Sequence, residues 1–442
     1  MEKNLTQGSV FKTIVSFSLP YFLAYFLQTL YGLADLFIIG RFCTVDATTA
    51  VSGGSQVMHM LTVMTVGLAM GSTVTIARAV GAGERDRACR AVGNTAVLFL
   101  IVALAAAAAL TACAGGIVSL LSTPETAVQG TAEYLRICFL GIPFIMAYNI
   151  LSSVFRGLGD SKAPMYFVAA ACVFNIALDY LFIGALGMGP AGAALGTTLS
   201  QAASVVISLA VIVSRRMLPG LKREHFRPER AVMGDILKIG VPVAAQDGFI
   251  QVAFVSVTVF ANLRGLADAA AVGVVEKIIG ILFLVPSSML SAVSAIAAQN
   301  FGARRPDRAR ETLRYAVIIS VSFGIAAAVC MQLAAEGAVG LFTQDGEVIR
   351  LGAQYMHGYV FDCIFAGVHF CFSGYFCACG RSGISFAHNC ASILTARIPL
   401  AYIASRSFAS LLPMGLASPI GSAVSTVICL AVYARMRKKE AP

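Results

Sequence analysis

The sequence predicts an all-α polytopic membrane protein, with twelve transmembrane helices in two six-helix lobes that are related by a parallel repeat. Three observations predict this fold class. Hydrophobic residues make up 58% of the 442 residues, and charged residues only 12%. Apolar runs of about 20 residues, each long enough to cross a hydrocarbon core, recur along the whole chain. Short motifs also repeat at about half the chain length.

The first apolar run, from Ile14 to Gly40, contains a carboxylate at membrane depth. Inserting an Asp side chain at such a depth costs roughly 2.5–3.5 kcal/mol on insertion scales, so Asp35 is not there for stability. Gln28 and Tyr31 precede Asp35 by seven and four residues, and the helical period places all three on one face. We interpret this face as the lining of a watery cavity used by an ion or a substrate.

Counting the apolar runs gives twelve predicted spans, at about 14–40, 52–77, 92–113, 133–155, 164–186, 191–214, 236–262, 270–297, 313–335, 350–377, 384–404 and 411–434. Alternate connections between them hold most of the Lys and Arg residues. By the positive-inside rule, those connections and both termini are expected on the cytoplasmic side of the plasma membrane. The net charge of +10 therefore does not predict a nucleic-acid partner.

An internal repeat divides the chain. The segment GAGERDRA at 81–88 recurs as GARRPDRA at 302–309, an offset of 221 residues. Six spans return the chain to its starting side, so the two halves are predicted to share one orientation, an arrangement known from transporters. The predicted organisation is an N-terminal lobe at 1–214, a basic cytoplasmic linker at 215–235 and a C-terminal lobe at 236–442.

The fifth predicted span carries a second polar pair. Asn175 and Asp179 are four residues apart and therefore share one helix face. Together with Asp35 they would bring two carboxylates and one amide into the first lobe. Such a group raises the affinity for a proton, and an oxygen cage of this kind can equally hold a small hard cation. The alternative is a hydrogen-bonded contact between helices.

Other polar side chains lie within the predicted spans. They are Gln56, His59, Asp247, Gln251, Glu276 and Asp362. The acids of the spans outnumber the bases, which are Arg136, Lys277 and Arg397. A cavity with this balance is biased negative and favours cationic cargo.

Catalysis and resident metals are not predicted. The sequence contains no HExxH, no GxSxG and no Asp-rich magnesium motif, which argues against an intramembrane enzyme. Cys377 and Cys379 are two residues apart and point to different sides of a helix, so we interpret the cysteines as packing residues. We expect no cofactor other than a coupling H⁺ or Na⁺.

The whole chain resembles the multidrug and toxic compound extrusion (MATE) family. The resemblance is carried by LxxxYGLADLFIIG in the first span, GAxxxDRA after the second and eighth spans, NxxxD in the fifth and RIP in the eleventh. It implies a V-shaped pair of helix bundles. It also implies export of organic cations and other amphipathic drugs by antiport against sodium or protons.

The resemblance also implies site residues. Asp35, Asn175, Asp179 and Thr197 match the first-lobe cation site of the archaeal, DinF-like branch. Pro20 matches the proline at which the first span bends in that branch. In the second lobe, Asp362 resembles an acid of the sodium-coupled branch, and Asp247 lies near the glutamate of that branch's seventh span. The predicted substrate cavity includes Gln28, Tyr31, Gln56, His59, Asp247, Gln251 and Asp362.

The predicted function is secondary active antiport by alternating access in the plasma membrane. Inward movement of H⁺ or Na⁺ would drive export of organic cations, amphipathic drugs or metabolites. The expected partners are these small molecules and the lipid bilayer, and the expected state is a monomer. The alternative is a lipid-linked glycan flippase of the same superfamily, which would be expected to show a basic cavity.

Overall fold

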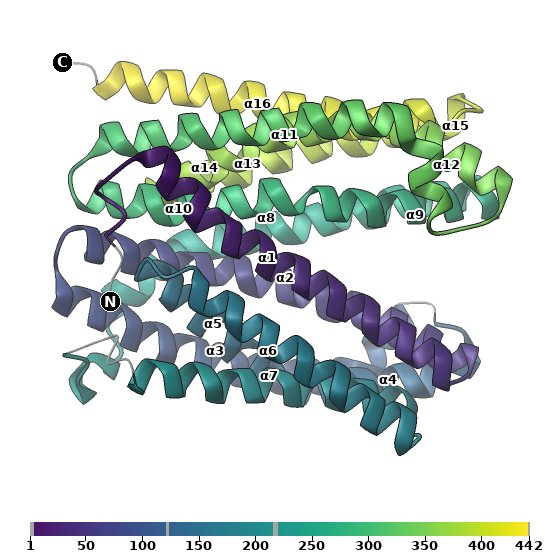
Figure 1. Cartoon of the computed structure of the whole chain (residues 1–442), viewed down its shortest axis with the longest axis horizontal. Helices are drawn as coiled ribbons and strands as arrows, with labels where there is room; N and C mark the ends of the chain where they lie inside the picture. Colours follow the sequence, from purple (N-terminus) through teal and green to yellow (C-terminus); the bar gives the residue numbers. More distant parts are fainter. Residues whose placement is uncertain (1–3, 121–122, 215–219, 441–442) are drawn as a thin grey trace. The chain divides into compact units, whose positions relative to one another are not determined.

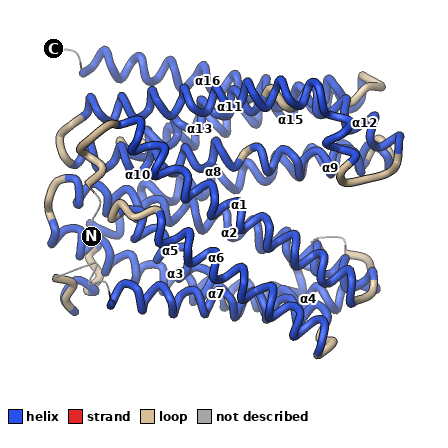
Figure 2. Tube along the Cα trace, viewed as in Figure 1, coloured by secondary structure: helices blue, strands red, loops and turns tan. Residues whose placement is uncertain are grey.

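The computed structural model describes residues 4–120, 123–214 and 220–440, and every regular element within these ranges is helical (Figures 1 and 2). Six helical segments cover the first half: α1 (Val10–Phe42), α2 (Val45–Gly81), α3 (Arg85–Leu120), α4 (Glu125–Leu140) with α5 (Ile142–Gly157), α6 (Lys162–Asp179) with the π-helical turn η1 (Tyr180–Ala185), and α7 (Gly189–Ser214). These segments correspond to the first six predicted spans.

Six further segments follow a short 3-10 helix, η2 (Arg223–Phe226). They are α8 (Arg230–Asn262), α9 (Leu266–Leu282) with α10 (Leu284–Gly302), α11 (Pro306–Gly340), α12 (Gly346–Tyr359) with α13 (Asp362–Ala378), α14 (Ser382–Ser392) with the π-helical turn η3 (Ile393–Arg397) and α15 (Ile398–Ser407), and α16 (Leu412–Glu440). By length and composition, 9 of the described helices could cross a membrane, or up to 11 if each bent pair counts as one span. The remaining predicted span is the run from α14 to α15, which is divided into three short elements.

Both halves contain a bent span at the same place in the repeat. The axes of α4 and α5 differ by 50° across Gly141, and those of α12 and α13 differ by 44°. A Cβ atom on Gly141 would overlap Thr198 of α7, so the bend packs closely against a neighbouring helix. The shared bend shows that the sequence repeat is also a structural repeat.

The helices form two compact units. The first consists mainly of Leu19–Ala244, and the second contains Gln7–Ser18, Ala245–Phe301 and Arg305–Pro442. The division therefore falls inside α1, next to Pro20, and inside α8, just after Pro242. These units do not share their boundaries with the predicted lobes 1–214 and 236–442, which stay a prediction.

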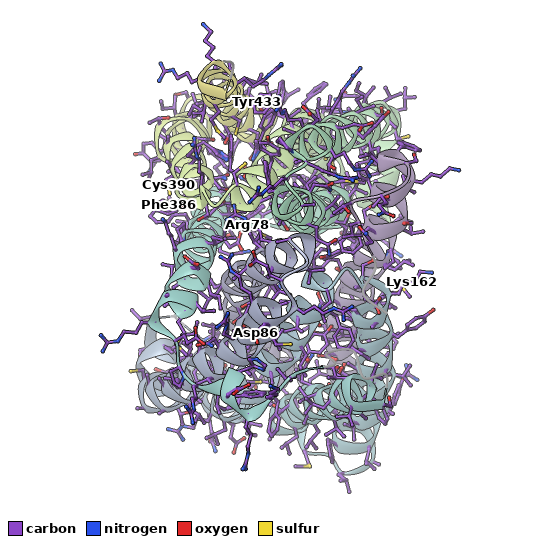
Figure 3. The ribbon with its side chains drawn as sticks, turned by 90° about the vertical axis from the view of Figure 1, so that its left-hand side faces the viewer. Arg78, Asp86, Lys162, Phe386, Cys390 and Tyr433 are labelled. Carbon is purple, nitrogen blue, oxygen red and sulfur yellow. The ribbon has the colours of Figure 1, made fainter. Side chains whose placement is uncertain are left out.

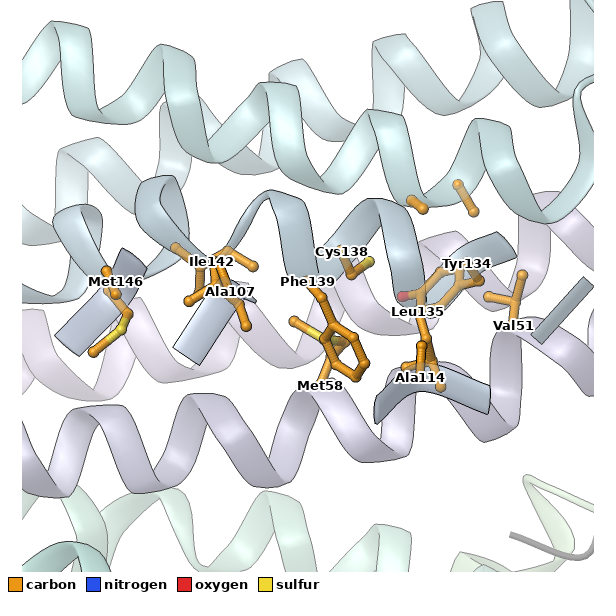
Figure 4. Packing of buried hydrophobic residues seen from close by; sticks show 14 of the residues in the cluster. Val51, Met58, Ala107, Ala114, Tyr134, Leu135, Cys138, Phe139, Ile142 and Met146 are labelled. Atoms are coloured by element: carbon orange, nitrogen blue, oxygen red, sulfur yellow. The ribbon is translucent and has the colours of Figure 1, made fainter. Parts of the chain in front are cut away.

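In the first unit, α2, α3, α4 and α5 enclose an apolar core. Met58 of α2 lies beside Phe139 of α4, which is fully buried, and Val51 of α2 and Ala107 of α3 belong to the same cluster (Figure 4). Outward-facing positions of the same helices are also apolar, for example Leu100, which is exposed on α3. A helix that is apolar on all faces is typical of a membrane span.

A corresponding core holds the second unit together. Val257 of α8 and Val275 of α9 pack in one cluster with Tyr355 and Tyr359 of α12 and with Ala401 of α15. All five side chains are buried. The two tyrosine rings are 5.6 Å apart between centroids, so the middle of this core is aromatic and carries hydroxyl groups.

The basic connections of the first unit gather at one end of its helices. Arg78 lies in the last turn of α2, Asp86 lies in the first turn of α3 and Lys162 begins α6; Figure 3 labels all three. They belong to the connections after the second and fourth predicted spans, which the charge pattern assigns to one side of the membrane. The assignment of that side to the cytoplasm stays a prediction.

The linker is partly folded onto the first unit. Residues 215–219 lie outside the described residues, but His225 of η2 is 4% exposed and packs on α3. Its Nε2 lies 3.0 Å from Oδ1 of Asp86, and Oδ1 of Asn94 accepts a hydrogen bond of 2.7 Å from the backbone N–H of Glu229. A Cβ atom on Gly93 would overlap the carbonyl oxygen of His225. The described part of the linker is therefore a fixed element that leads into α8.

Close packing of α2 on the start of α8 supplies a test of this fold. A Cβ atom on Gly71 would overlap the carbonyl oxygen of Ile236, whereas one on Gly53 of the same helix would meet nothing within 4 Å. We expect Gly71→Ala to lower the free energy of unfolding by about 1–3 kcal/mol, because the backbone must move apart. Thermal unfolding followed by circular dichroism in detergent measures this loss.

Gly53→Ala is the matched control, and its stability should be unchanged or higher, because Ala exceeds Gly in helix propensity by up to about 1 kcal/mol. Equal behaviour of the two variants would contradict the close approach of α2 and α8.

Candidate cation site

The site begins with a buried acid on α1. Asp35 is 9% exposed, and within the described residues its Oδ1 atom is buried without a hydrogen-bond partner. Tyr31, one turn earlier on the same helix, lies within interaction range of this carboxylate, as the shared helix face predicts. Asp35 therefore faces inward from a helix whose other side is apolar.

A second acid comes from α6. Asn175 and Asp179 are 1% and 0% exposed, and they lie one turn apart on the same helix face. Directly after Asp179 the helix changes to the π-helical turn η1. Such turns widen a helix locally and are frequent at functional sites. The polar side-chain atoms of both residues are buried, and none has a hydrogen-bond partner in the described part of the chain.

The fold brings these residues together. Asn175, Asp179 and Thr197 of α7 all lie within interaction range of the Asp35 carboxylate. The hydroxyl group of Thr197 is likewise buried and unpartnered among the described residues. The result is a small group of hard oxygen donors, two of them carboxylates, with an amide beside them. A proton or a small hard cation is the species that such a group is suited to hold.

Gly196 is a site residue that sequence reasoning missed. It precedes Thr197 on α7, and a Cβ atom at this position would overlap Oδ1 of Asp179. Glycine therefore allows the Asp179 carboxyl to lie directly against the backbone of α7. The sequence does contain a pattern that could have indicated it, because Gly192 and Gly196 form the GxxxG spacing that allows membrane helices to approach closely.

Tyr134 of α4 is another member that the sequence did not indicate. Its ring is 3% exposed, and its hydroxyl group interacts with both Asp35 and Tyr31. The carboxylate of Asp35 thus interacts with two phenol groups, from α1 and α4, and with polar groups of α6 and α7. Four helices of the first unit meet at this acid.

Other predicted residues lie apart from this group. Gln56 and His59 are exposed on α2, and Gln28 is half-buried two turns before Asp35. Pro20 lies within α1, which continues as one helix through it. None of these four is shown in contact with the carboxylate pair.

The acids of the second unit are arranged differently. Asp362 is fully buried at the start of α13, and both it and Glu276 of α9 interact with Arg397 at the end of η3. Asp247, which is half-buried on α8 as is Gln251, interacts instead with Cys377 of α13. The predicted second-lobe residues therefore do not form one cluster.

These features define a class of protein. Two structurally repeated halves, spans that are apolar on their outer faces and a buried pair of carboxylates between helices are the features of a membrane transporter rather than of a receptor or a structural span. The MatE family model matches residues 20–181 and again 242–403. This chain belongs to the multidrug and toxic compound extrusion (MATE) family of membrane transporters.

Relatives and solved structures agree with this assignment. A probable multidrug resistance protein of Bacillus subtilis, YpnP, is 29% identical over 397 residues, which cover 90% of this chain and 88% of YpnP. The multidrug export protein MepA of Staphylococcus aureus is 24% identical over 383 residues, covering 85% of this chain and 83% of MepA.

Among solved structures, the outward-facing conformation of a multidrug resistance MATE family transporter has a TM-score of 0.90 at 22% identity and covers 98% of this chain and 97% of that one. A MOP superfamily transporter from Pyrococcus furiosus has a TM-score of 0.88 at 23% identity, with the same coverage. These similarities concern the fold. The predicted family and the predicted twelve-helix, two-lobe fold are confirmed.

The unpartnered carboxylates supply a stability test. We expect Asp179→Asn to raise the melting temperature in sodium-free buffer at pH 8, because an amide of the same shape replaces a buried carboxylate. The gain is bounded by the insertion cost of Asp at membrane depth, roughly 2.5–3.5 kcal/mol. Thermal unfolding of the purified protein measures the change.

Glu133→Gln is the control, since Glu133 is exposed on α4 and its neutralisation should leave the melting temperature unchanged. A lower melting temperature for Asp179→Asn would mean that this carboxylate has stabilising partners in the folded protein.

Proposed function

We propose that this chain is a secondary active antiporter that exports organic cations, other amphipathic drugs or metabolites, driven by inward movement of H⁺ or Na⁺. The observation that carries the proposal is the pair Asp35 and Asp179, buried together with Asn175 and Thr197 and without counter-ion in the described structure. The printed names of the relatives, multidrug resistance and multidrug export proteins, support the cargo class.

The coupling step follows from charge. Two carboxylates in an apolar interior repel each other, and a cation from outside neutralises part of this charge. Because the ligands come from α1, α6 and α7, their binding draws these three helices together. The acids therefore bind the cation and change the packing of the helices, and they need not take part in covalent chemistry.

The inward movement also supplies energy. One positive charge that crosses a potential of about 100 mV releases about 2.3 kcal/mol. This energy can drive cargo in the opposite direction only if the helices of the first unit pack differently with and without the bound cation. The site would then alternate its access between the two sides of the plasma membrane.

Pro20 is the proposed hinge for this change. Proline has no backbone N–H, so the carbonyl of Ser16, one turn earlier, has no α-helical partner there. The division between the two compact units falls beside this residue. A change in the packing of α1 around Asp35 can therefore be absorbed at Pro20 without unwinding the helix.

The cargo is proposed to contact the polar side chains of the predicted substrate cavity. The residues proposed for this role are Gln28, Tyr31, Gln56, His59, Asp247, Gln251 and Asp362. Gln56 and His59 suit it because their side chains are exposed on α2 and free to meet a bound molecule. We also propose that the protein acts as a monomer, with both termini in the cytoplasm.

Uptake of ethidium into inverted proteoliposomes tests antiport and identifies the ion. We expect uptake under either a proton gradient alone or a sodium gradient alone, because the first unit holds one exchangeable cation. Asp35→Asn should reduce gradient-driven uptake to the level of protein-free liposomes. Glu133→Gln, an exposed acid of the same unit, should transport as the wild type does.

Uptake that persists in Asp35→Asn would remove Asp35 from coupling. Absence of gradient-driven transport for several cations in a well-reconstituted preparation would favour the lipid-linked glycan flippase instead.

Gly196 supplies a second transport test. We expect Gly196→Ala to raise the coupling-ion concentration needed for half-maximal uptake by about 10–100-fold, the usual effect of disturbing the residues that position ion ligands. The physical reason is the overlap between an added Cβ atom and Oδ1 of Asp179. Initial rates of ethidium uptake at increasing ion gradients measure this concentration.

Gly184→Ala in η1 is the matched control, because a Cβ atom there would lie at an ordinary 3.5 Å from the ring of Phe42. Unchanged ion dependence in Gly196→Ala would show that Asp179 does not need its present position.

A further inference from the structure

The second unit contains a buried arginine that the proposed coupling mechanism does not use. Arg397 ends the π-helical turn η3 and is 8% exposed. Its Nη2 donates a hydrogen bond of 2.6 Å to the hydroxyl oxygen of Tyr359, and its Cζ lies 4.7 Å above the ring of Phe254. The guanidinium group is therefore fixed between α8 and α12, and it stays charged because its protons are not lost in proteins.

Two acids flank this guanidinium. Asp362 of α13 and Glu276 of α9 both interact with Arg397, but within the described residues neither forms an ion pair with it at 4.0 Å or less. Both oxygens of Asp362 and one of Glu276 are buried without hydrogen-bond partners in the described structure. The other oxygen of Glu276 accepts a bond of 3.4 Å from the Thr258 hydroxyl group. The acids are balanced by a nearby charge and not by direct contact.

The neighbouring lysine does not provide this balance. Lys277 follows Glu276 in the sequence, but its side chain is exposed on α9. Arg397 is therefore the buried cation that balances Asp362 and Glu276 among the described residues of this group.

The internal repeat identifies the residue of the first half that is equivalent to Arg397. The two stretches matched by the family model begin and end 222 residues apart, and this offset carries Asn175 onto Arg397. Both residues lie in the fifth span of their half, and each of these spans contains a π-helical turn. The first unit thus has two acids and a neutral amide, whereas the second has two acids and a permanent cation at the equivalent position.

We propose that Arg397 is an internal, non-exchangeable cation that takes, in the second unit, the place of the cation that the first unit binds from solution. This inference rests on the proposed function of the first unit. It explains why the two repeated halves differ in function, since only the first unit then exchanges a coupling ion. Arg397 is in this sense a specificity residue, because its charge excludes sodium and other small cations from the acids around it.

Binding of radioactive ²²Na⁺ to the purified protein at pH 8 tests the proposal. We expect Arg397→Gln to bind one more sodium ion per chain than the wild type, because Asp362 and Glu276 lose their counter-charge. The expected gain does not depend on whether the wild type binds sodium or a proton in its first unit. Arg397→Lys, which keeps the charge, should show the wild-type number.

Two further variants make the result specific. Arg406→Gln removes an exposed arginine from the adjoining helix α15 and should bind no additional sodium. The double variant Arg397→Gln with Asp362→Asn should lose the additional ion, because one of its ligands is gone. An additional ion that persists in the double variant, or that appears in Arg406→Gln, would overturn the proposed site.

Arg397→Met provides a second route if the glutamine variant does not fold. The side chain of Met is uncharged at every pH, so this variant should also gain a sodium ion. A folded Arg397→Gln or Arg397→Met protein that binds no more sodium than the wild type overturns the inference. Failure of the proposed function is seen separately, because Asp35→Asn would then leave gradient-driven uptake unchanged whatever happens at Arg397.

Discussion

The constraint on which the first unit depends is the placement of two carboxylates in an apolar interior, with no counter-charge among the residues that the structure describes. The helices around Asp35 and Asp179 are positioned by it. Tyr134 approaches from α4, Thr197 approaches from α7, and Gly196 lets the Asp179 carboxyl lie against the backbone. The hydroxyl groups of Tyr134 and Thr197 can donate a hydrogen bond to a carboxylate, but neither carries a positive charge. In the proposed function, the missing charge is supplied by a cation from outside the protein.

The second unit also buries two acids, but it places an arginine beside them. Its acids Asp362 and Glu276 surround Arg397, which is held by the Tyr359 hydroxyl group and by the ring of Phe254. A guanidinium group tolerates such a site because its charge is spread over a plane that can stack on aromatic rings. Two halves with one architecture can therefore treat a buried negative charge in opposite ways. Duplication of a fold does not imply duplication of its function.

The sequence was sufficient for the architecture because membrane spans are specified locally. Hydropathy and the repeat predicted the twelve segments, and helical spacing placed Tyr31 and Asp35 on one face. The gathering of Asp35, Asn175, Asp179 and Thr197 was predicted from the family resemblance, and the structure places them together. The prediction did not include Gly196 or Tyr134. Their importance depends on how closely α4, α6 and α7 approach one another, which no local sequence pattern encodes.

The same limit explains Arg397. In the sequence it is one intramembrane base among several acids. Its partners Asp362 and Glu276 are separated from it by 35 and 121 positions along the chain and meet it only when α9, α13 and η3 have packed. Lys277 adjoins Glu276 in the sequence, yet its side chain is exposed. Long-range packing decides charge balance in this unit, and adjacency does not.

The start of α1 has a consequence for the order in which the molecule is completed during synthesis. Gln7–Ser18 belongs to the second compact unit, where Arg308 donates a hydrogen bond of 3.0 Å to the carbonyl oxygen of Gly8 and Phe11 packs on Tyr315. Domains generally assemble from the N-terminus as the chain emerges from the ribosome. This segment is thus synthesised about 300 residues before the partners that it packs against. Until those partners are made, Gln7–Ser18 lacks the contacts that hold it in the finished structure.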